Sequence, residues 1–172
     1  MSDSFMKYVI TGLTISRMLL APFVFFSFAS GTYATGMSLF LLARVTDILD
    51  GFLARRYKNE TETGAFLDQI ADRIGMVSLT GGFFVGSDFP FYAFLIFAGR
   101  DLFLIILNSA IFFQENPIPK PTVLSMSATF LQFASIMSYY FLFFERTFLV
   151  TAILFTAASS IECIFLMRNR KK

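Results

Sequence analysis

Charged side chains stand inside the most apolar stretches of the chain. The chain has 172 residues, of which 56% are hydrophobic and 25 are Phe. A single Asp, Lys or Arg at the centre of a membrane-spanning helix costs about 2.5–3.5 kcal/mol, so several of them together indicate a site that needs their charge. The residues concerned are Arg17, Arg44, Asp47, Asp50, Asp68, Asp72, Arg73, Arg100, Asp101 and Glu162.

Four of these residues are aspartates that form two pairs. Asp47 and Asp50 are three positions apart, and Asp68 and Asp72 are four apart, so each pair projects from one side of a helix. Four carboxylates in a pocket of low dielectric constant repel one another and take up protons unless a dense positive charge keeps them ionised. The spacing therefore predicts a site for one or two divalent cations.

The remaining composition limits which metal this site can hold. The chain has no His and a single cysteine, Cys163, so ligands must be oxygen atoms. Oxygen ligands favour magnesium, manganese or calcium. The lone cysteine also excludes a disulfide within the chain.

Two other interpretations of the buried charges remain open. In the first, the aspartates form structural ion pairs with Arg44, Arg73 and Arg100, since Arg44 and Asp47 are one helical turn apart. In the second, the chain is a cation or proton transporter, because intramembrane carboxylates also line ion paths. A transport path needs polar groups across the full thickness of the membrane. The four aspartates are expected at one depth, which favours an enzyme pocket open to one side.

The elements that must position these residues are six apolar segments, each long enough to cross a bilayer of about 30 Å. We expect an all-α integral membrane protein, a bundle of six transmembrane helices that forms a single domain over residues 1–172. Arg17 interrupts the first apolar segment, which we interpret as a retained helix and not as a signal peptide. The expected helices cover residues 8–28, 33–56, 64–86, 89–113, 122–144 and 148–168.

Basic residues in the loops predict the orientation of the bundle. With alternating helices, nearly all Lys and Arg outside the spans fall on one side, which places both termini in the cytoplasm. The net charge of +2 is thus mainly a topology signal, and no nucleic-acid partner is expected. Only Arg146 lies on the opposite side; the cytoplasmic residues are Lys7, Arg55, Arg56, Lys58, Lys120, Arg168, Arg170, Lys171 and Lys172.

A motif joins the four aspartates. From Asp47 to Asp72 the chain reads DILDGFLARRYKNETETGAFLDQIAD, which is D-x2-D-G-x2-A-R-x8-G-x3-D-x3-D at every fixed position. In this motif the chain resembles the CDP-alcohol phosphotransferase (CDP-alcohol phosphatidyltransferase) family. The resemblance implies an enzyme that transfers the phosphatidyl group of CDP-diacylglycerol to a small alcohol, with Mg²⁺ or Mn²⁺, two ions, as cofactor. It also implies that Asp47, Asp50 and Asp68 hold the metals, and that Asp72 both ligates metal and acts as the general base.

Other motif residues are expected to bind the CDP-lipid. Gly51, Ala54 and Gly64 are small enough for a base and a diphosphate to approach the helix backbones, although small residues also serve helix packing. Arg55 carries a fork of donors suited to phosphate oxygens. The resemblance adds Thr61, which can equally be a solvated residue at the start of a helix.

The first helix carries a second part of the resemblance. Residues 11–17 read TGLTISR, which is similar to the N-x-L-T-x-x-R stretch of the family. This places Thr14 and Arg17 beside the nucleotide site. Thr11 stands where the family usually has Asn.

Acceptor choice is read from the fourth and fifth helices. Gly99-Arg100-Asp101 and Lys120-Pro121-Thr122-x-x-Ser125 are similar to CMP-forming cardiolipin synthases, but Met126 and Ala128 replace a Lys and an Asn of that pattern. Phosphatidylglycerophosphate synthases commonly show G-R-E on the fourth helix and K-T-x-x-Q on the fifth, and Ala128 also replaces the Lys of the second pattern. Glycerol 3-phosphate is the preferred acceptor, phosphatidylglycerol is the alternative, and Arg100 and Lys120 are the expected acceptor-binding residues.

Assembly and location follow from the same resemblance. Gly82 and Gly86 form a small-xxx-small pair that allows close helix contact, so a homodimer is expected. The expected location is the bacterial plasma (inner) membrane, with an active site that faces the cytoplasm.

Overall fold

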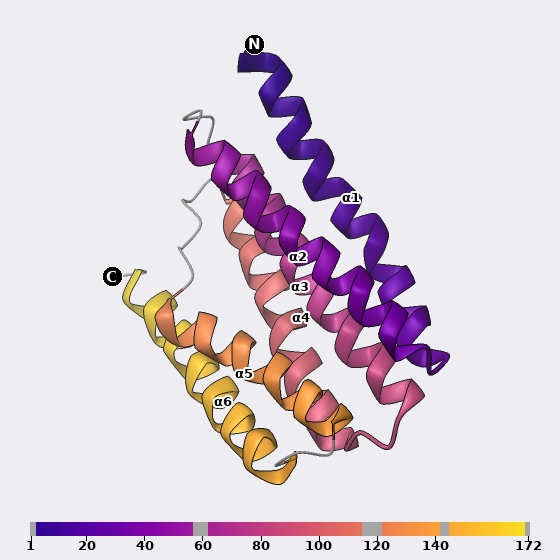
Figure 1. The fold of residues 1–172 in the computed structure, drawn as a ribbon. Helices are drawn as coiled ribbons and strands as arrows, with labels where there is room; N and C mark the ends of the chain where they lie inside the picture. The colour runs from indigo at the N-terminus through magenta and orange to yellow at the C-terminus, as the bar shows by residue number, and fades with distance from the viewer. Residues whose placement is uncertain (1–2, 57–61, 115–121, 142–144, 171–172) are drawn as a thin grey trace. The chain divides into compact units, whose positions relative to one another are not determined.

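The structure, a computed structural model, describes residues 3–56, 62–114, 122–141 and 145–170. Within these ranges, the side chains of residues 3–11, 49–56, 62, 145 and 166–170 lie outside the description. The described chain is all-helical, as the sequence predicts. Its helices are α1 (Asp3–Ala29), α2 (Tyr33–Arg56), α3 (Glu62–Gly86), α4 (Phe91–Phe113), α5 (Val123–Tyr140) and α6 (Glu145–Arg170) (Figure 1).

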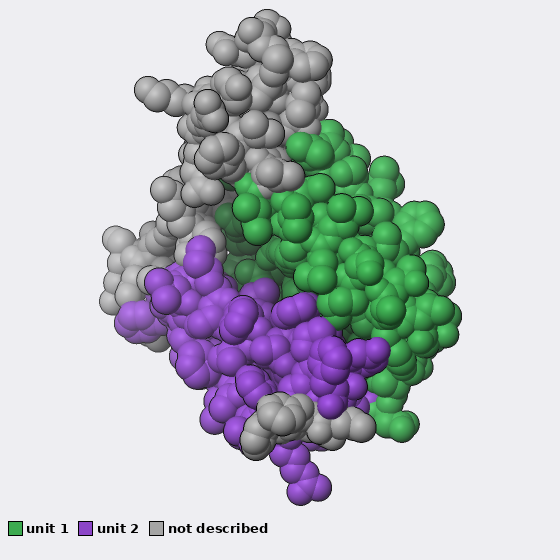
Figure 2. All heavy atoms as spheres, in the orientation of Figure 1, with its two compact units in different colours: residues 1–88, 101–118 green, residues 89–100, 119–172 purple. Residues whose placement is uncertain are grey.

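The chain falls into two compact units, coloured separately in Figure 2. Unit 1 contains residues 1–88 and 101–118, and unit 2 contains residues 89–100 and 119–172. Helix α4 contributes its first half to unit 2 and its second half to unit 1.

In unit 1, α1 packs along both α2 and α3, whereas α2 and α3 contact each other in only a few places. Glycines permit the close approach of α1 and α3. A Cβ atom at Gly82 would lie 2.9 Å from the Cβ of Phe28, and one at Gly86 would collide with the Phe28 carbonyl. The small-xxx-small pair, expected at a dimer contact, is therefore used within the chain.

A tight turn joins α1 to α2 in unit 1. Gly31 has a φ of 75°, in the left-handed region that a residue without Cβ enters at no steric cost. The Gly31 N–H donates to the Phe28 carbonyl and the Thr32 N–H donates to the Ser27 carbonyl. These bonds satisfy carbonyls that the helix end would leave without partners.

In unit 2, α5 and α6 pack along each other. The Thr122 hydroxyl caps α5 by accepting from the Ser125 N–H at 3.1 Å, and the same hydroxyl donates to Glu162 at 2.7 Å. Helix α5 ends at Tyr140, earlier than the expected 144, where the Phe141 N–H caps the last turn by donating to the Met137 carbonyl.

Large apolar side chains cover the outside of the helices. On α1, for example, Leu19, Phe23 and Phe26 are each more than 60% exposed, whereas Val24 and Phe28 are buried. Water would make such surfaces costly, and lipid would not. Among the described residues three helical segments are long and apolar enough to span a membrane: Gly12–Ala29, Phe91–Phe113 and Arg146–Phe165.

Candidate active site

Arg17 on α1 joins two of the predicted metal ligands. Its guanidinium is buried, and its Nη1 donates to the Asp47 carboxylate on α2 while its Nη2 donates to Asp68 on α3 at 2.6 Å. The same Nη2 lies 3.5 Å from the hydroxyl of Thr14, one turn earlier on α1 and also buried. Carboxylates from two helices thus converge on one side chain of a third.

The carboxylates of Asp47 and Asp68 also lie within hydrogen-bonding reach of each other. Two ionised carboxylates in contact repel, so the pair requires either a shared proton or a cation. Arg17 supplies one positive charge for the two acids. Asp68 keeps half of its side chain exposed, and Asp47 keeps 29%, so a further cation can reach both.

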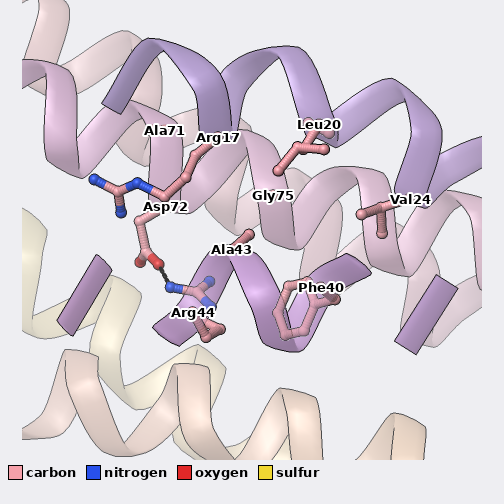
Figure 3. Close-up of a pocket in the computed structure, with 10 residues that line it drawn as sticks. Arg17, Leu20, Val24, Phe40, Ala43, Arg44, Ala71, Asp72 and Gly75 are labelled. Carbon is pink, nitrogen blue, oxygen red and sulfur yellow. Dashed lines mark hydrogen bonds and ion pairs between the residues drawn. The ribbon is translucent and has the colours of Figure 1, made fainter. Parts of the chain in front are cut away.

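Asp72, the predicted general base, contacts a different arginine. Arg44 Nη1 on α2 donates to the Asp72 carboxylate on α3, and the Arg44 guanidinium lies 5.0 Å from the centroid of the Phe40 ring. The arginine predicted as a possible partner of Asp47 therefore pairs with Asp72 across two helices. In Figure 3 the Asp72 carboxylate and the Arg44 guanidinium point toward each other.

A small cavity adjoins these charges within unit 1. Arg17, Arg44 and Asp72 line its polar end, and Leu20, Val24 and Phe40 line its apolar end (Figure 3). The cavity volume is about 20 Å³, which is enough for one or two water molecules. It is far too small for a nucleotide or an acyl chain.

The donor set of this cluster fits a hard divalent cation. Asp47, Asp68 and Asp72 offer carboxylate oxygen atoms on adjacent helices, and oxygen is the ligand that magnesium and manganese prefer. Within the side chains that the structure describes, no three such ligands gather around one point. Asp50, the fourth predicted ligand, lies on helical backbone of α2 but its side chain is outside the described part.

Several predicted lipid-binding residues cannot be placed as side chains. Gly51, Ala54 and Arg55 lie on the last turns of α2, and only their helical backbone is described. Thr61 lies outside the described residues. Gly64 lies on the first turns of α3 and is half-buried.

Arg73, next to Asp72 on α3, forms a buried ion pair with α4. Its Nη1 lies 3.2 Å from the Asp101 carboxylate, and both side chains are buried. Nearby, the Asn108 amide on α4 donates to Gln69 on α3 at 2.9 Å. These bonds fix the rotation of α3, and therefore the direction in which Asp72 points.

Arg100, predicted to bind the acceptor, is buried in unit 2, where its described bonds go to neutral oxygen atoms. Its Nη2 donates to the Ser125 hydroxyl at 3.0 Å and to the Ser159 hydroxyl at 3.1 Å, while its Nη1 donates to Thr129 at 3.2 Å and Gln132 at 3.5 Å. These bonds join α4, α5 and α6. Lys120, the second predicted acceptor residue, lies outside the described residues.

Sequence reasoning missed the contribution of α6 to this polar cluster. Ser159 and Thr156 are buried on one face of α6, where Thr156 bonds the Gln132 amide at 3.3 Å. Their separation of three residues within an apolar helix is the signal that could have revealed them. The alternative of ion pairs between the motif aspartates and Arg44, Arg73 and Arg100 is seen only for Arg44 among the bonds described above.

Comparisons with known proteins confirm the family that the motif indicates. The family model for CDP-alcohol phosphatidyltransferase matches residues 9–158. A probable CMP-forming cardiolipin synthase of Drosophila melanogaster is 34% identical over 141 residues, which are 72% of this chain and 44% of the relative.

Bacterial relatives carry a different acceptor in their names. A CDP-diacylglycerol–glycerol-3-phosphate 3-phosphatidyltransferase of Aquifex aeolicus is 28% identical over 130 residues, covering 73% of this chain and 71% of the relative. One from Haemophilus influenzae is 44% identical over 70 residues, covering 38% and 37%. The chain thus spans less than half the length of two of these three relatives. No solved structure matches the chain significantly.

Proposed function

The chain belongs to the CDP-alcohol phosphatidyltransferase family, and from this premise we propose that it transfers the phosphatidyl group of CDP-diacylglycerol to a glycerol-type alcohol and releases CMP. The observation that carries the proposal is the convergence of Asp47 on α2 and Asp68 on α3 upon Arg17 of α1. Acidic groups at the junction of three apolar helices are expensive, and phosphatidyl transfer is a use that requires them.

Each residue of the cluster then has a role. Asp47, Asp50 and Asp68 would hold the metal, and Asp72 would take part in metal binding and accept the proton of the attacking hydroxyl. Thr14 and Arg17 would lie beside the diphosphate, where a buried guanidinium suits phosphate oxygens. Gly51, Ala54, Arg55, Thr61 and Gly64 complete the proposed donor site.

The proposed cofactor is Mg²⁺ or Mn²⁺, bound as two ions. When bound, such ions neutralise phosphoryl oxygens and stabilise a leaving phosphate. The chain itself orients the hydroxyl at Asp72 and holds α3 in register through the Arg73–Asp101 pair. The acceptor oxygen forms a bond to the phosphorus that bears diacylglycerol, the bond from that phosphorus to CMP breaks, and the hydroxyl proton passes to Asp72.

Glycerol 3-phosphate is the proposed acceptor. Relatives named for this acceptor occur in Aquifex aeolicus and Haemophilus influenzae. Phosphatidylglycerol is the second candidate, favoured by the Drosophila relative named as a CMP-forming cardiolipin synthase. Arg100 and Lys120 stay predicted acceptor residues, although the described bonds of Arg100 connect α4 to α5 and α6.

The proposed setting is the bacterial inner membrane. The six helices would span it with both termini in the cytoplasm, so that the acyl chains of the donor stay in the bilayer while its nucleotide reaches a cytoplasm-facing pocket. A tag placed after Lys172 and one at Lys58 should both be accessible only from the cytoplasm. A homodimer stays part of the proposal, but it requires a face other than Gly82 and Gly86, which contact α1.

The function is tested by assaying the purified protein with radiolabelled CDP-diacylglycerol, Mg²⁺ and a panel of alcohols. Lipid-linked label and CMP should appear in equal amounts with glycerol 3-phosphate or with phosphatidylglycerol. Cation flux in proteoliposomes without any transfer would favour the transporter interpretation. Hydrolysis of the donor without transfer to any alcohol would also refute the proposal.

A further inference from the structure

Arg44 is a charged residue of the cluster that belongs to neither the motif from Asp47 to Asp72 nor the stretch of residues 11–17. It lies on α2 one turn before Asp47, and its guanidinium reaches across to α3, where it pairs with Asp72. The other arginine of the cluster, Arg17, donates to the carboxylates of Asp47 and Asp68, two of the predicted metal ligands. Arg44 therefore stands at the general base and not at the predicted lipid diphosphate.

The surroundings of Arg44 hold it in place without burying it. The Phe40 ring lies under the guanidinium, with 5.0 Å from the ring centroid to Cζ, as in a cation–π contact. The side chains of Arg44 and Asp72 stay 29% and 27% exposed, so a small solute can reach both. A guanidinium has five N–H donors, and the pair with Asp72 uses Nη1, so donors remain for a second anion.

This pairing fixes where the acceptor must lie relative to Arg44. The attacking hydroxyl must come within hydrogen-bonding reach of Asp72. Any acceptor in that position lies within a few ångströms of the Arg44 guanidinium.

We propose that Arg44 selects the acceptor: its guanidinium binds a phosphate group carried by the alcohol whose hydroxyl lies at Asp72. The inference rests on the proposed function and narrows the acceptor class to phosphate-bearing alcohols. Phosphate oxygens match the guanidinium fork in geometry and charge, and an uncharged polyol does not. The phosphate can be a monoester, as in glycerol 3-phosphate, or a diester, as in phosphatidylglycerol.

The experiment compares Arg44→Gln with the wild type on three acceptors: glycerol 3-phosphate, phosphatidylglycerol in mixed micelles, and uncharged glycerol. Loss of the charged hydrogen bonds should raise KM for the preferred phosphate-bearing acceptor about 10- to 100-fold. The ratio of kcat/KM for that acceptor to kcat/KM for glycerol should fall by about 10- to 100-fold, because glycerol has no phosphate for the guanidinium to bind. A raised KM for glycerol 3-phosphate would show that Arg44 binds a phosphate monoester, and a raised KM for phosphatidylglycerol would show that it binds a diester.

Two further variants separate selection from a structural role. Arg44→Lys keeps the charge but loses the fork and should restore part of the affinity, whereas Arg146→Gln removes an exposed arginine at the start of α6 and should change no KM. Thermal unfolding in detergent checks that Arg44→Gln is folded.

The outcomes are distinguishable from failure of the proposed function. If the wild type transfers to none of the three acceptors, the proposed function fails before Arg44 is tested. If the wild type is active but Arg44→Gln loses kcat equally on all three acceptors, or keeps an unchanged KM for the phosphate-bearing one, Arg44 does not select the acceptor.

Discussion

Arg17 in unit 1 and Arg100 in unit 2 are both buried arginines on apolar helices, yet their described bonds are of different kinds. Arg17 bonds two carboxylates, on α2 and α3. Arg100 bonds hydroxyl, amide and carbonyl oxygens of α5 and α6, including Ser125, Gln132 and Ser159. The described bonds of Arg17 are thus ionic, whereas those of Arg100 go to neutral oxygen atoms.

The difference shows which region is suited to chemistry. An ionic cluster can exchange partners. A metal ion can take the place of a guanidinium beside a carboxylate, and a phosphate can take the place of a carboxylate beside a guanidinium. A network of directed bonds to neutral oxygens mainly fixes helix positions, since each lost bond leaves a buried polar group unsatisfied. We therefore expect substitutions in unit 1 to act on turnover and those in unit 2 to act on stability.

Removing the metal or its ligands should have the largest effect. A chelator should abolish transfer, and added Mg²⁺ or Mn²⁺ should restore it. Asp47→Asn, Asp50→Asn and Asp68→Asn should each reduce transfer to background, because each removes a hard oxygen ligand. Their melting temperatures should stay near that of the wild type. Asp88→Asn, at an exposed acid outside the cluster, is the matched control, and full activity in chelator would refute the metal site.

Replacing the general base should have the next largest effect. Asp72→Asn should lower kcat about 10²- to 10⁴-fold, because the hydroxyl proton loses its acceptor. Binding of CDP-diacylglycerol, measured by isothermal titration in detergent, should change far less. A loss of donor binding as complete as in Asp50→Asn would make Asp72 an ordinary ligand, and wild-type turnover would assign the base to another group.

Removing the guanidinium of unit 2 should destabilise the protein without a selective effect on chemistry. Arg100→Leu leaves buried partners such as Ser159 and Gln132 without the Arg100 donor, at a cost of about 1–3 kcal/mol in the free energy of unfolding. Chemical denaturation in detergent measures this cost, and Arg146→Leu serves as the exposed control. An unchanged stability with a raised acceptor KM would instead assign Arg100 to the acceptor site and break the contrast between the two units.

The smallest expected effect concerns the start of α5. Thr122→Val removes the hydroxyl that caps the helix and donates to Glu162 on α6. The free energy of unfolding should fall by about 1 kcal/mol, the usual cost of losing an N-cap, while kcat and KM stay unchanged. Thr122→Ser keeps the hydroxyl and should keep the stability. A change in acceptor KM at constant stability would count against a purely structural unit 2.

The sequence alone determined the family and the helices. Helix positions follow from apolar runs between Gly, Pro and charged breaks, which are local features, so most predicted bounds lie within a few residues of those observed. The motif from Asp47 to Asp72 identified the family because all its fixed positions lie within one short stretch of the chain. The family model over residues 9–158 confirms that reading.

The tertiary structure alone decided the partners. Periodicity places Asp47 and Asp50 on one side of a helix, but it does not say which side chain of another helix that side meets. Local spacing suggested Arg44 as a partner of Asp47, whereas the packing of α2 beside α3 brings Arg44 to Asp72. The glycines of α3 likewise pack against α1. Residues far apart in sequence decide which helix lies against a face of small residues, so sequence alone did not show this contact.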